Sequence, residues 1–194
     1  MDKCYEVVLE HHRERIPRSR GASASQQVDG VTAPRRWLLV PILIALVWPT
    51  SAPAQVGEVF TASVTRVADG DTITVTRAGD AVRIRLDGID TPEANQPFGR
   101  EATAFLSARV LHQRVTVTVK DVDRYGRFVS RVSVGGEDVS LALVAAGLAW
   151  HYVRYSDDAA LTHAEADART NEIGLWAQSA PVAPWEFRRQ SRRR

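Results

Sequence analysis

Hydrophobic and polar residues alternate in five stretches of the chain, and this spacing of two predicts β-strands. The first three predicted strands are joined by tight turns at Asp69–Gly70 and Ala78–Asp80, so they form an antiparallel meander. The other two flank the largely polar stretch 121–126. In chain order, the five predicted strands are residues 56–67, 72–76, 82–86, 115–119 and 127–134.

Three further stretches predict helices. Residues 99–112 carry apolar side chains at helical spacing. Residues 139–146 end at Gly147, the residue type common just after a helix, and residues 159–171 follow Ser156, which begins a run of capping residues. A helix between the third and fourth of five strands is the layout of a small OB-type barrel. The sequence therefore predicts an α+β fold that is predominantly β, a five-stranded OB-type barrel with about three helices.

The first 54 residues lack this pattern, and we interpret them as an N-terminal extension followed by a signal peptide. Arg35-Arg36 precedes an apolar run over residues 37–48, and Ala52-Pro53-Ala54 then supplies a small-x-small cleavage site. A membrane span needs about 20 apolar residues, so this run is too short to cross a bilayer. We therefore expect cleavage after Ala54 and a secreted or periplasmic protein without stable membrane association.

Three points about this segment stay open. A signal peptide normally begins a chain, so Val31 is a candidate for the true start, and an unusually long leading segment is the rival interpretation. The arginine pair loosely resembles a twin-arginine signal, which leaves Sec and Tat export both possible. A short buried helix is the alternative for residues 37–48.

The predicted mature chain has neither net charge nor cysteine. Of the 25 Lys and Arg residues 7 lie before residue 55, as do 5 of the 23 Asp and Glu residues, so 18 of each remain. Cys4 precedes the signal, which excludes disulfides, thiolate catalysis and a Cys-based metal site. We assign residues 55–180 to the folded domain and residues 181–194 to a Pro/Arg-rich C-terminal tail. Whether that tail binds phosphate or is merely solvated stays open.

Acidic residues follow two predicted turns in a pattern that suits a cation site. Asp69 belongs to the first turn itself, whereas Asp71 begins a strand, where Thr or Val would be the usual β-former. In the loop Asp90-Thr91-Pro92-Glu93, the proline fixes the backbone, so both carboxylates can project into one pocket. Carboxylate oxygens, a backbone carbonyl and water are the ligands that Ca²⁺ prefers. The alternative is a polar loop with two solvated acids.

Arginine and aromatic residues near these acids suit a phosphate ester. Arg85 lies on a predicted strand and Arg127 begins another after a glycine. Two guanidinium groups that converge on such a pocket can hold a phosphate and stabilise the charge that grows during attack, although single arginines in these places are usually surface residues. Tyr152 and Tyr155 can stack a nucleobase, with packing at the rim as the alternative. No Gly-x-Ser-x-Gly elbow supports acyl transfer.

Seven motifs in a fixed order resemble the thermonuclease (staphylococcal nuclease-like) family. They occur with family-like gaps over about residues 57–176, and as an ordered set they are highly specific. The motifs are Val67-Ala-Asp-Gly-Asp-Thr-Ile-Thr-Val75, Val82-Arg-Ile-Arg-Leu-Asp-Gly-Ile-Asp-Thr-Pro-Glu93, Gly99-Arg-Glu-Ala102, Asp123-Arg-Tyr-Gly-Arg127, Leu143-Val-Ala-Ala-Gly-Leu-Ala149, Ala164-Glu165 and Gly174-Leu-Trp176.

The resemblance implies an OB-type barrel and Ca²⁺-dependent cleavage of DNA and RNA at the 5′ P–O bond. By position, Asp71 and Asp90 match the family's calcium carboxylates. Thr91 matches the residue that donates a backbone carbonyl to the cation. Glu93 matches the residue usually assigned as general base.

The resemblance also assigns the substrate-binding residues. Arg85 and Arg127 match the two phosphate-binding arginines, and Tyr155 aligns with an aromatic residue beside the nucleotide. Val153 stands where a second tyrosine is expected, and Lys120 is the only lysine after residue 54, so the family's lysine-rich surface is missing.

We therefore expect a secreted, calcium-dependent endonuclease, a monomeric hydrolase that cleaves DNA and RNA with little sequence selectivity. Two alternatives stay open. One is a non-catalytic OB-type module that binds nucleic acid or protein, and the other is a phosphodiesterase with a small or specialised substrate. The sequence identifies no group that would protonate the departing 5′ oxygen.

Overall fold

A computed structural model describes residues 55–193 of the chain. The predicted N-terminal extension, the signal peptide, the candidate start at Val31 and cleavage after Ala54 all concern residues outside this range and stay predictions. The part of the chain that the structure describes contains no helix long and apolar enough to cross a membrane.

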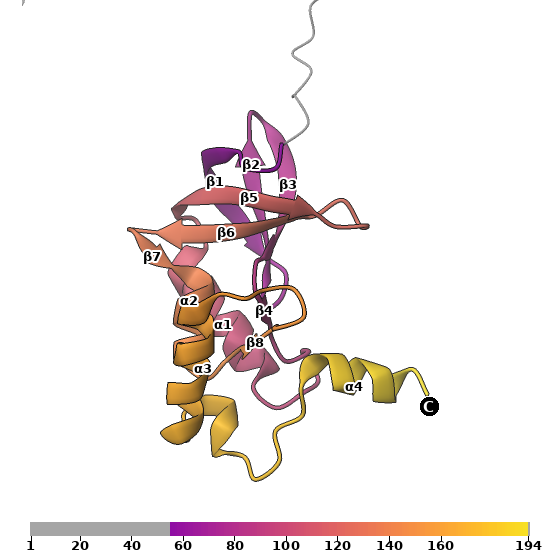
Figure 1. The fold of residues 1–194 in the computed structure, drawn as a ribbon. Helices are drawn as coiled ribbons and strands as arrows, with labels where there is room; N and C mark the ends of the chain where they lie inside the picture. Colours follow the sequence, from indigo (N-terminus) through magenta and orange to yellow (C-terminus); the bar gives the residue numbers. More distant parts are fainter. Residues whose placement is uncertain (1–54, 194) are drawn as a thin grey trace, which may run out of the picture. The chain divides into compact units, whose positions relative to one another are not determined.

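Five strands form the predicted barrel (Figure 1). Neighbouring strands pair in the order β3-β2-β1-β5-β6, and a parallel pairing of β3 with β6 joins the two ends and closes the sheet. This observation confirms the prediction of a five-stranded OB-type barrel. The strands are β1 (Val59–Val67), β2 (Thr72–Arg77), β3 (Asp80–Leu86), β5 (Arg114–Val122) and β6 (Phe128–Val134).

The interior of the barrel explains the alternation in the sequence. Ile73 and Val75 on β2 and Ile84 and Leu86 on β3 are all buried, and the residues between them are less buried or exposed. Successive side chains on a strand point to opposite faces, so a spacing of two sends one set into the core. Fully burying a side chain of this size is worth about 1.5–3 kcal/mol.

The remaining elements surround one end of the barrel. The three predicted helices are present as α1 (Gly99–Val110), α2 (Val139–Ala145) and α3 (Ala159–Thr170). Gly147 follows α2 with a positive φ of 63°, as predicted for a residue after a helix. The five predicted strands and three predicted helices do not include β4 (Ile89–Asp90), β7 (Glu137–Asp138), β8 (Trp150–His151), the 3₁₀ helix η1 (Gly174–Ala177) and α4 (Pro184–Ser191).

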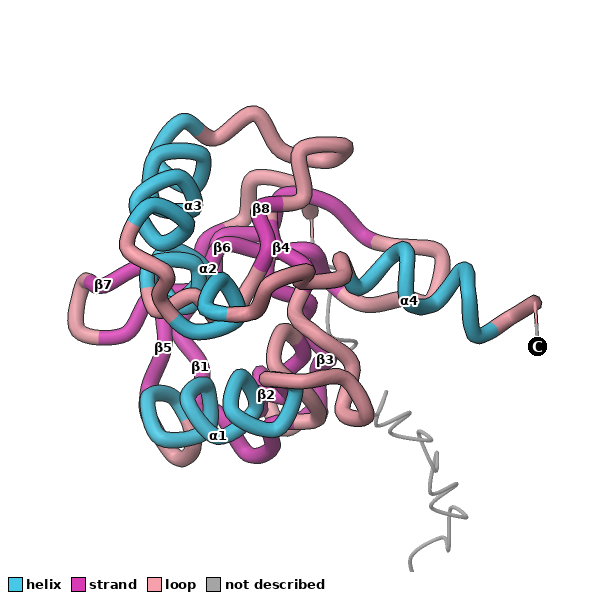
Figure 2. Tube along the Cα trace, turned by 90° about the horizontal axis from the view of Figure 1, so that it is seen from below, coloured by secondary structure: helices cyan, strands magenta, loops and turns pink. Residues whose placement is uncertain are grey.

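Helix α4 changes the interpretation of the C-terminal segment. Residues 181–194 were predicted to be a Pro/Arg-rich tail, yet residues 184–191 form a helix with Pro184 at its first turn. Figure 2 shows α4 on the opposite side of the short β4–β8 pair from α3. The helix forms here because Trp185 packs against aromatic side chains of the domain, a tertiary contact that residue pattern alone does not reveal.

Candidate active site

The three predicted acidic residues, Asp71, Asp90 and Glu93, come from two segments of the chain. Asp71 directly precedes β2, Asp90 lies on β4, and Glu93 follows in the next loop. Asp69 accepts a hydrogen bond from the backbone N–H of Asp71 at 3.1 Å, so it shapes the turn, as predicted. The side chain of Asp71 is 5% exposed and that of Asp90 1%, whereas the side chain of Glu93 is 38% exposed. Two of the three predicted acids are therefore buried, not solvated.

Two glycines allow this close arrangement. A Cβ atom on Gly70 would lie 2.6 Å from Oγ1 of Thr91, and one on Gly99 would lie 2.0 Å from the backbone oxygen of Glu93. A larger residue at position 99 would force the backbone apart, and one at position 70 would press against the side chains of Thr91 and Ala102. The turn before β2 and the first turn of α1 thus pack directly on the loop that carries Glu93.

Thr91 fixes the orientation of Asp71. Its backbone N–H and its hydroxyl donate to Oδ2 of Asp71 at 3.1 and 3.2 Å, and the hydroxyl of Thr72 donates to Oδ1 at 3.1 Å. Buried carboxylates need such partners, because an unpaired buried charge is costly. The structure shows the role of Thr91 toward Asp71, while the predicted role of its carbonyl as a cation ligand stays a prediction.

Arg85 links the two buried carboxylates. It donates to Oδ1 of Asp71 and to Oδ1 of Asp90, each at 2.7 Å. Burial raises the pKa of Asp71, and the nearby Arg85 charge opposes that rise. Burial acts to lower the pKa of Arg85, but the charges of Asp71 and Asp90 outweigh it, so that pKa is raised and the guanidinium stays charged.

A second arginine reaches the same cluster, and the sequence analysis missed it. Arg188 on α4 donates to Oδ2 of Asp90 at 2.6 Å, to Oδ1 of Asp90 at 3.3 Å and to Oε1 of Glu93 at 2.7 Å. Burial lowers its pKa, but the hydrogen bonds to Asp90 and Glu93 and their charges outweigh this, so the pKa of Arg188 is raised. Its one sequence signal was the arginine-rich end of the chain, which does not single out position 188.

Arg127 lies apart from this network. Its Nε and Nη2 atoms both lie 2.7 Å from Oδ2 of Asp123, within the turn between β5 and β6. Strand pairing still places it near the site, because Val129 on β6 is the register partner of Arg85 on β3. Arg127 precedes Val129 by two residues, about 7 Å along a strand, and alternation puts both on the same face. The structure thus brings together Asp71, Arg85, Asp90, Thr91 and Glu93, and leaves Arg127 at the edge.

The two predicted stacking tyrosines differ in environment. The ring of Tyr152 stacks on Trp185 of α4, with centroids 4.8 Å apart and planes 3° from parallel, so one of its faces is covered. Tyr155 meets the edge of Tyr152 and is 67% exposed. Tyr155 is therefore the better placed of the two to meet a base, and Trp185 is an aromatic residue that the sequence analysis did not consider.

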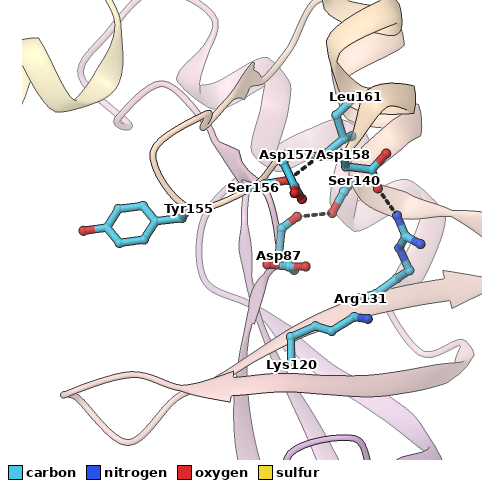
Figure 3. A pocket seen from close by; sticks show the side chains of 9 residues that line it. All are labelled: Asp87, Lys120, Arg131, Ser140, Tyr155, Ser156, Asp157, Asp158 and Leu161. Atoms are coloured by element: carbon cyan, nitrogen blue, oxygen red, sulfur yellow. Dashed lines mark hydrogen bonds and ion pairs between the residues drawn. The ribbon is translucent and has the colours of Figure 1, made fainter.

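A pocket of about 310 Å³ has a lining that shares only Tyr155 with the predicted site residues (Figure 3). Asp87, Lys120 and Arg131 face it from the barrel, and Tyr155 stands at its edge with the ring turned away from the other lining residues. Burial raises the pKa of Asp87, and the charges of Lys120 and Arg131 oppose the rise. None of the predicted cation or phosphate residues lines this pocket.

The donor chemistry of the cluster fits a hard cation. Within residues 55–193, no three His, Cys, Asp or Glu side chains are grouped closely enough to bind a metal on their own. Ca²⁺ takes six to eight oxygen ligands, however, and carbonyl and water oxygens commonly complete its shell. Two buried carboxylates beside Thr91 supply only oxygen donors, as such a cation requires.

Comparison with known proteins agrees with this geometry. The family model described as "Staphylococcal nuclease homologue" matches residues 83–178. An uncharacterized endonuclease of Escherichia coli O157:H7 is 40% identical over 148 residues, which are 76% of this chain and 94% of that protein. The micrococcal nuclease of Shigella flexneri is 36% identical over 162 residues, covering 78% and 92% of the two chains.

A plant protein shares the same region. Staphylococcal-like nuclease CAN1 of Arabidopsis thaliana is 44% identical over 110 residues, which are 57% of this chain and 34% of the plant protein. The bacterial relatives are matched over nearly their whole length at more than 30% identity. The resemblance predicted from the ordered motifs is confirmed, and the chain belongs to the staphylococcal nuclease family.

Proposed function

We propose that this protein is a secreted, calcium-dependent nuclease that hydrolyses phosphodiester bonds of DNA and RNA with little sequence selectivity. The observation that carries the proposal is the buried Asp71–Arg85–Asp90 network with Glu93 beside it. Membership of a nuclease family supports phosphodiester hydrolysis, and the predicted signal peptide supports secretion. The chain's calcium requirement and substrate range rest on donor chemistry and resemblance.

The carboxylates have separate tasks in this proposal. Asp71 and Asp90, with the carbonyl of Thr91, would hold Ca²⁺. Bound there, the ion supplies Lewis-acid polarisation of a phosphoryl oxygen and helps to orient water. Glu93 is more exposed than the other two acids, as a base that meets solvent must be. It would accept a proton from the attacking water.

The arginines handle the charge on phosphorus. As attack proceeds, negative charge grows on the phosphoryl oxygens, and preorganised guanidinium groups stabilise it more than they stabilise the substrate. Arg85 is held in place by Asp71 and Asp90, and Arg127 by Asp123, so both are oriented before substrate arrives. The leaving 5′ oxygen still needs a proton, and water is the simplest donor.

A cleavage assay tests the proposal. The full chain is incubated with single-stranded DNA, duplex DNA and RNA, in Ca²⁺ or in chelator, and the product ends are mapped. We expect all three substrates to be cut only with Ca²⁺. Cleavage of the 5′ P–O bond leaves a free 5′ hydroxyl, which polynucleotide kinase labels without prior dephosphorylation. Products with 5′ phosphates would contradict the assigned bond.

The same assay distinguishes the alternatives. A non-catalytic binding module would shift the mobility of nucleic acid but leave its length unchanged in Ca²⁺. A specialised phosphodiesterase would hydrolyse a small ester such as a thymidine p-nitrophenyl diester and leave polymers intact.

A further inference from the structure

Arg188 makes contacts that the proposed reaction does not use. All three hydrogen bonds of its side chain go to carboxylates, two to Asp90 and one to Glu93. The proposed function assigns these same groups to the cation and to the water. Arg188 therefore occupies carboxylate oxygens of Asp90 and Glu93 that the proposed reaction needs for the cation and for the attacking water.

The C-terminal segment is anchored so that Arg188 reaches this point. Trp185 stacks on Tyr152 and meets the edge of Trp150, with ring centroids 4.8 and 5.6 Å apart. Arg188 follows Trp185 by three residues and so lies on the same face of α4. The aromatic contacts thus turn the face that carries Arg188 toward the site.

A second link ties α4 to the loop of the proposed base. The side chain of buried Gln96 accepts a hydrogen bond from the backbone N–H of Glu93 at 2.9 Å. It also donates a hydrogen bond to the backbone oxygen of Val182 at 3.1 Å. Val182 lies two residues before α4. The loop that carries Glu93 and the segment that leads into α4 are therefore held together by one amide side chain.

Arg188 and a cation cannot use Asp90 in the same way at the same time. Oδ2 of Asp90 lies 2.6 Å from Arg188, and Oδ1 is shared between Arg85 at 2.7 Å and Arg188 at 3.3 Å. Guanidinium groups carry only hydrogen-bond donors, so Arg188 offers no ligand to a metal. A divalent ion at Asp90 would also lie beside the positive charge of Arg188, which adds repulsion.

We infer that Arg188 occupies the cation position of the site when no cation is bound, and that it thereby sets the affinity for Ca²⁺. The inference rests on the proposed function for the identity of the site. Binding of Ca²⁺ displaces Arg188 from Asp90, and the same displacement releases Glu93 to act as a base. A loss of charge-assisted hydrogen bonds of this kind corresponds to roughly ten- to hundredfold in affinity.

Calcium titration calorimetry of the full chain tests the inference directly. Arg188→Gln removes the competing charge, and Arg189→Gln is the matched control, because Arg189 is the next residue of α4 and is exposed. We expect Arg188→Gln to bind Ca²⁺ at least about tenfold more tightly than the native chain. Arg189→Gln should stay within about twofold of the native affinity, as expected for an exposed charge.

A second variant covers the case in which Arg188→Gln does not fold. Trp185→Leu keeps the arginine but removes the ring that stacks on Tyr152, so it should also raise the Ca²⁺ affinity. If Arg188→Gln binds Ca²⁺ no more tightly than Arg189→Gln does, the inference is contradicted. If Arg188→Gln does not fold, an unchanged Ca²⁺ affinity of Trp185→Leu contradicts the inference instead.

Asp71→Asn distinguishes a failure of the role of Arg188 from a failure of the proposed calcium site. If Asp71→Asn abolishes calcium binding and Arg188→Gln leaves it unchanged, only the role of Arg188 is contradicted. Absence of calcium binding in every variant, the native chain included, contradicts both this role and the proposed calcium dependence.

Discussion

Replacing Arg85 by glutamine tests whether the buried charge network holds the site together. Arg85 is the shared partner of Asp71 and Asp90, whose side chains are 5% and 1% exposed. The substitution leaves two buried carboxylates without that partner. Asp90 keeps Arg188, whereas Asp71 keeps only neutral donors from Thr72 and Thr91.

The structure sets the size of the expected effect. Removing one partner of a buried ion pair typically costs about 3–5 kcal/mol. Because the side chain of Arg85 is itself 21% exposed and water can partly replace it, we expect the lower end, about 3 kcal/mol. Domains of this kind are stable by about 5–15 kcal/mol, so the variant should still fold.

Urea unfolding followed by tryptophan fluorescence, in chelator at pH 8, measures this loss. Arg83→Gln is the control, since Arg83 lies on the same strand and is exposed. We expect it to change the free energy of unfolding by less than about 0.5 kcal/mol. A loss below about 1 kcal/mol for Arg85→Gln would refute the view that the buried carboxylates of Asp71 and Asp90 depend on Arg85 for charge compensation.

The pH dependence supplies an independent check. Burial raises the pKa of Asp71 above its usual 3.8, and Arg85 opposes the rise. A carboxyl with a raised pKa binds its proton more tightly when folded, so its contribution to stability falls as the pH rises from 3.8 through the folded value. Without Arg85 that fall extends to higher pH. The loss of unfolding free energy in Arg85→Gln, relative to the native chain, should therefore be larger at pH 8 than at pH 5. An equal loss at the two pH values would contradict the assignment of this effect to Asp71.

Three further predictions concern the packing around the Glu93 loop, the stacking of Tyr155 on a nucleobase and the C-terminal arginines. Gly99→Ala places a methyl group against the backbone of Glu93, so it should lower the free energy of unfolding by about 1–3 kcal/mol in urea and reduce cleavage; native stability would contradict the packing. Tyr155→Ala should weaken binding of single-stranded DNA by about 1–3 kcal/mol in anisotropy titrations at fixed salt, and unchanged affinity would remove this ring from the substrate site. Replacing exposed Arg192 and Arg193 by glutamine should reduce the slope of log affinity against log salt by about 1–2, whereas an unchanged slope would mean that neither contacts phosphate.

The barrel was predictable because its signal is local. Ile73, Val75, Ile84 and Leu86 alternate with more exposed residues along two strands, and that pattern follows directly from the geometry of a strand with one buried face. The two-residue strands β4 and β8 are too short to show alternation. They exist because Ile89 and its neighbour pair with a segment about 60 residues further along.

The site was predictable in part for the same reason. Asp71, Asp90 and Glu93 stand out locally, as a strand-starting acid and as acids around a proline. Arg188 does not, because its partner Asp90 is 98 residues away and nothing near position 188 marks it. The helix that carries Arg188 has few apolar residues, and it is held to the domain by the stacking of Trp185 on Tyr152. The residue pattern alone is therefore compatible with a solvated tail and does not predict this helix.

We propose that Glu93 activates water for calcium-dependent phosphodiester hydrolysis at this carboxylate–arginine site. The most direct measurement is the rate of single-stranded DNA cleavage in saturating Ca²⁺ by the native chain and by Glu93→Gln. Glu101→Gln, an exposed acid in the first turn of α1, is the control. We predict that Glu93→Gln lowers the catalytic rate constant by about 10²–10⁴-fold, that Glu101→Gln does not, and that chelator abolishes native cleavage. Undiminished cleavage by Glu93→Gln, or native cleavage that persists in chelator, would contradict the claim.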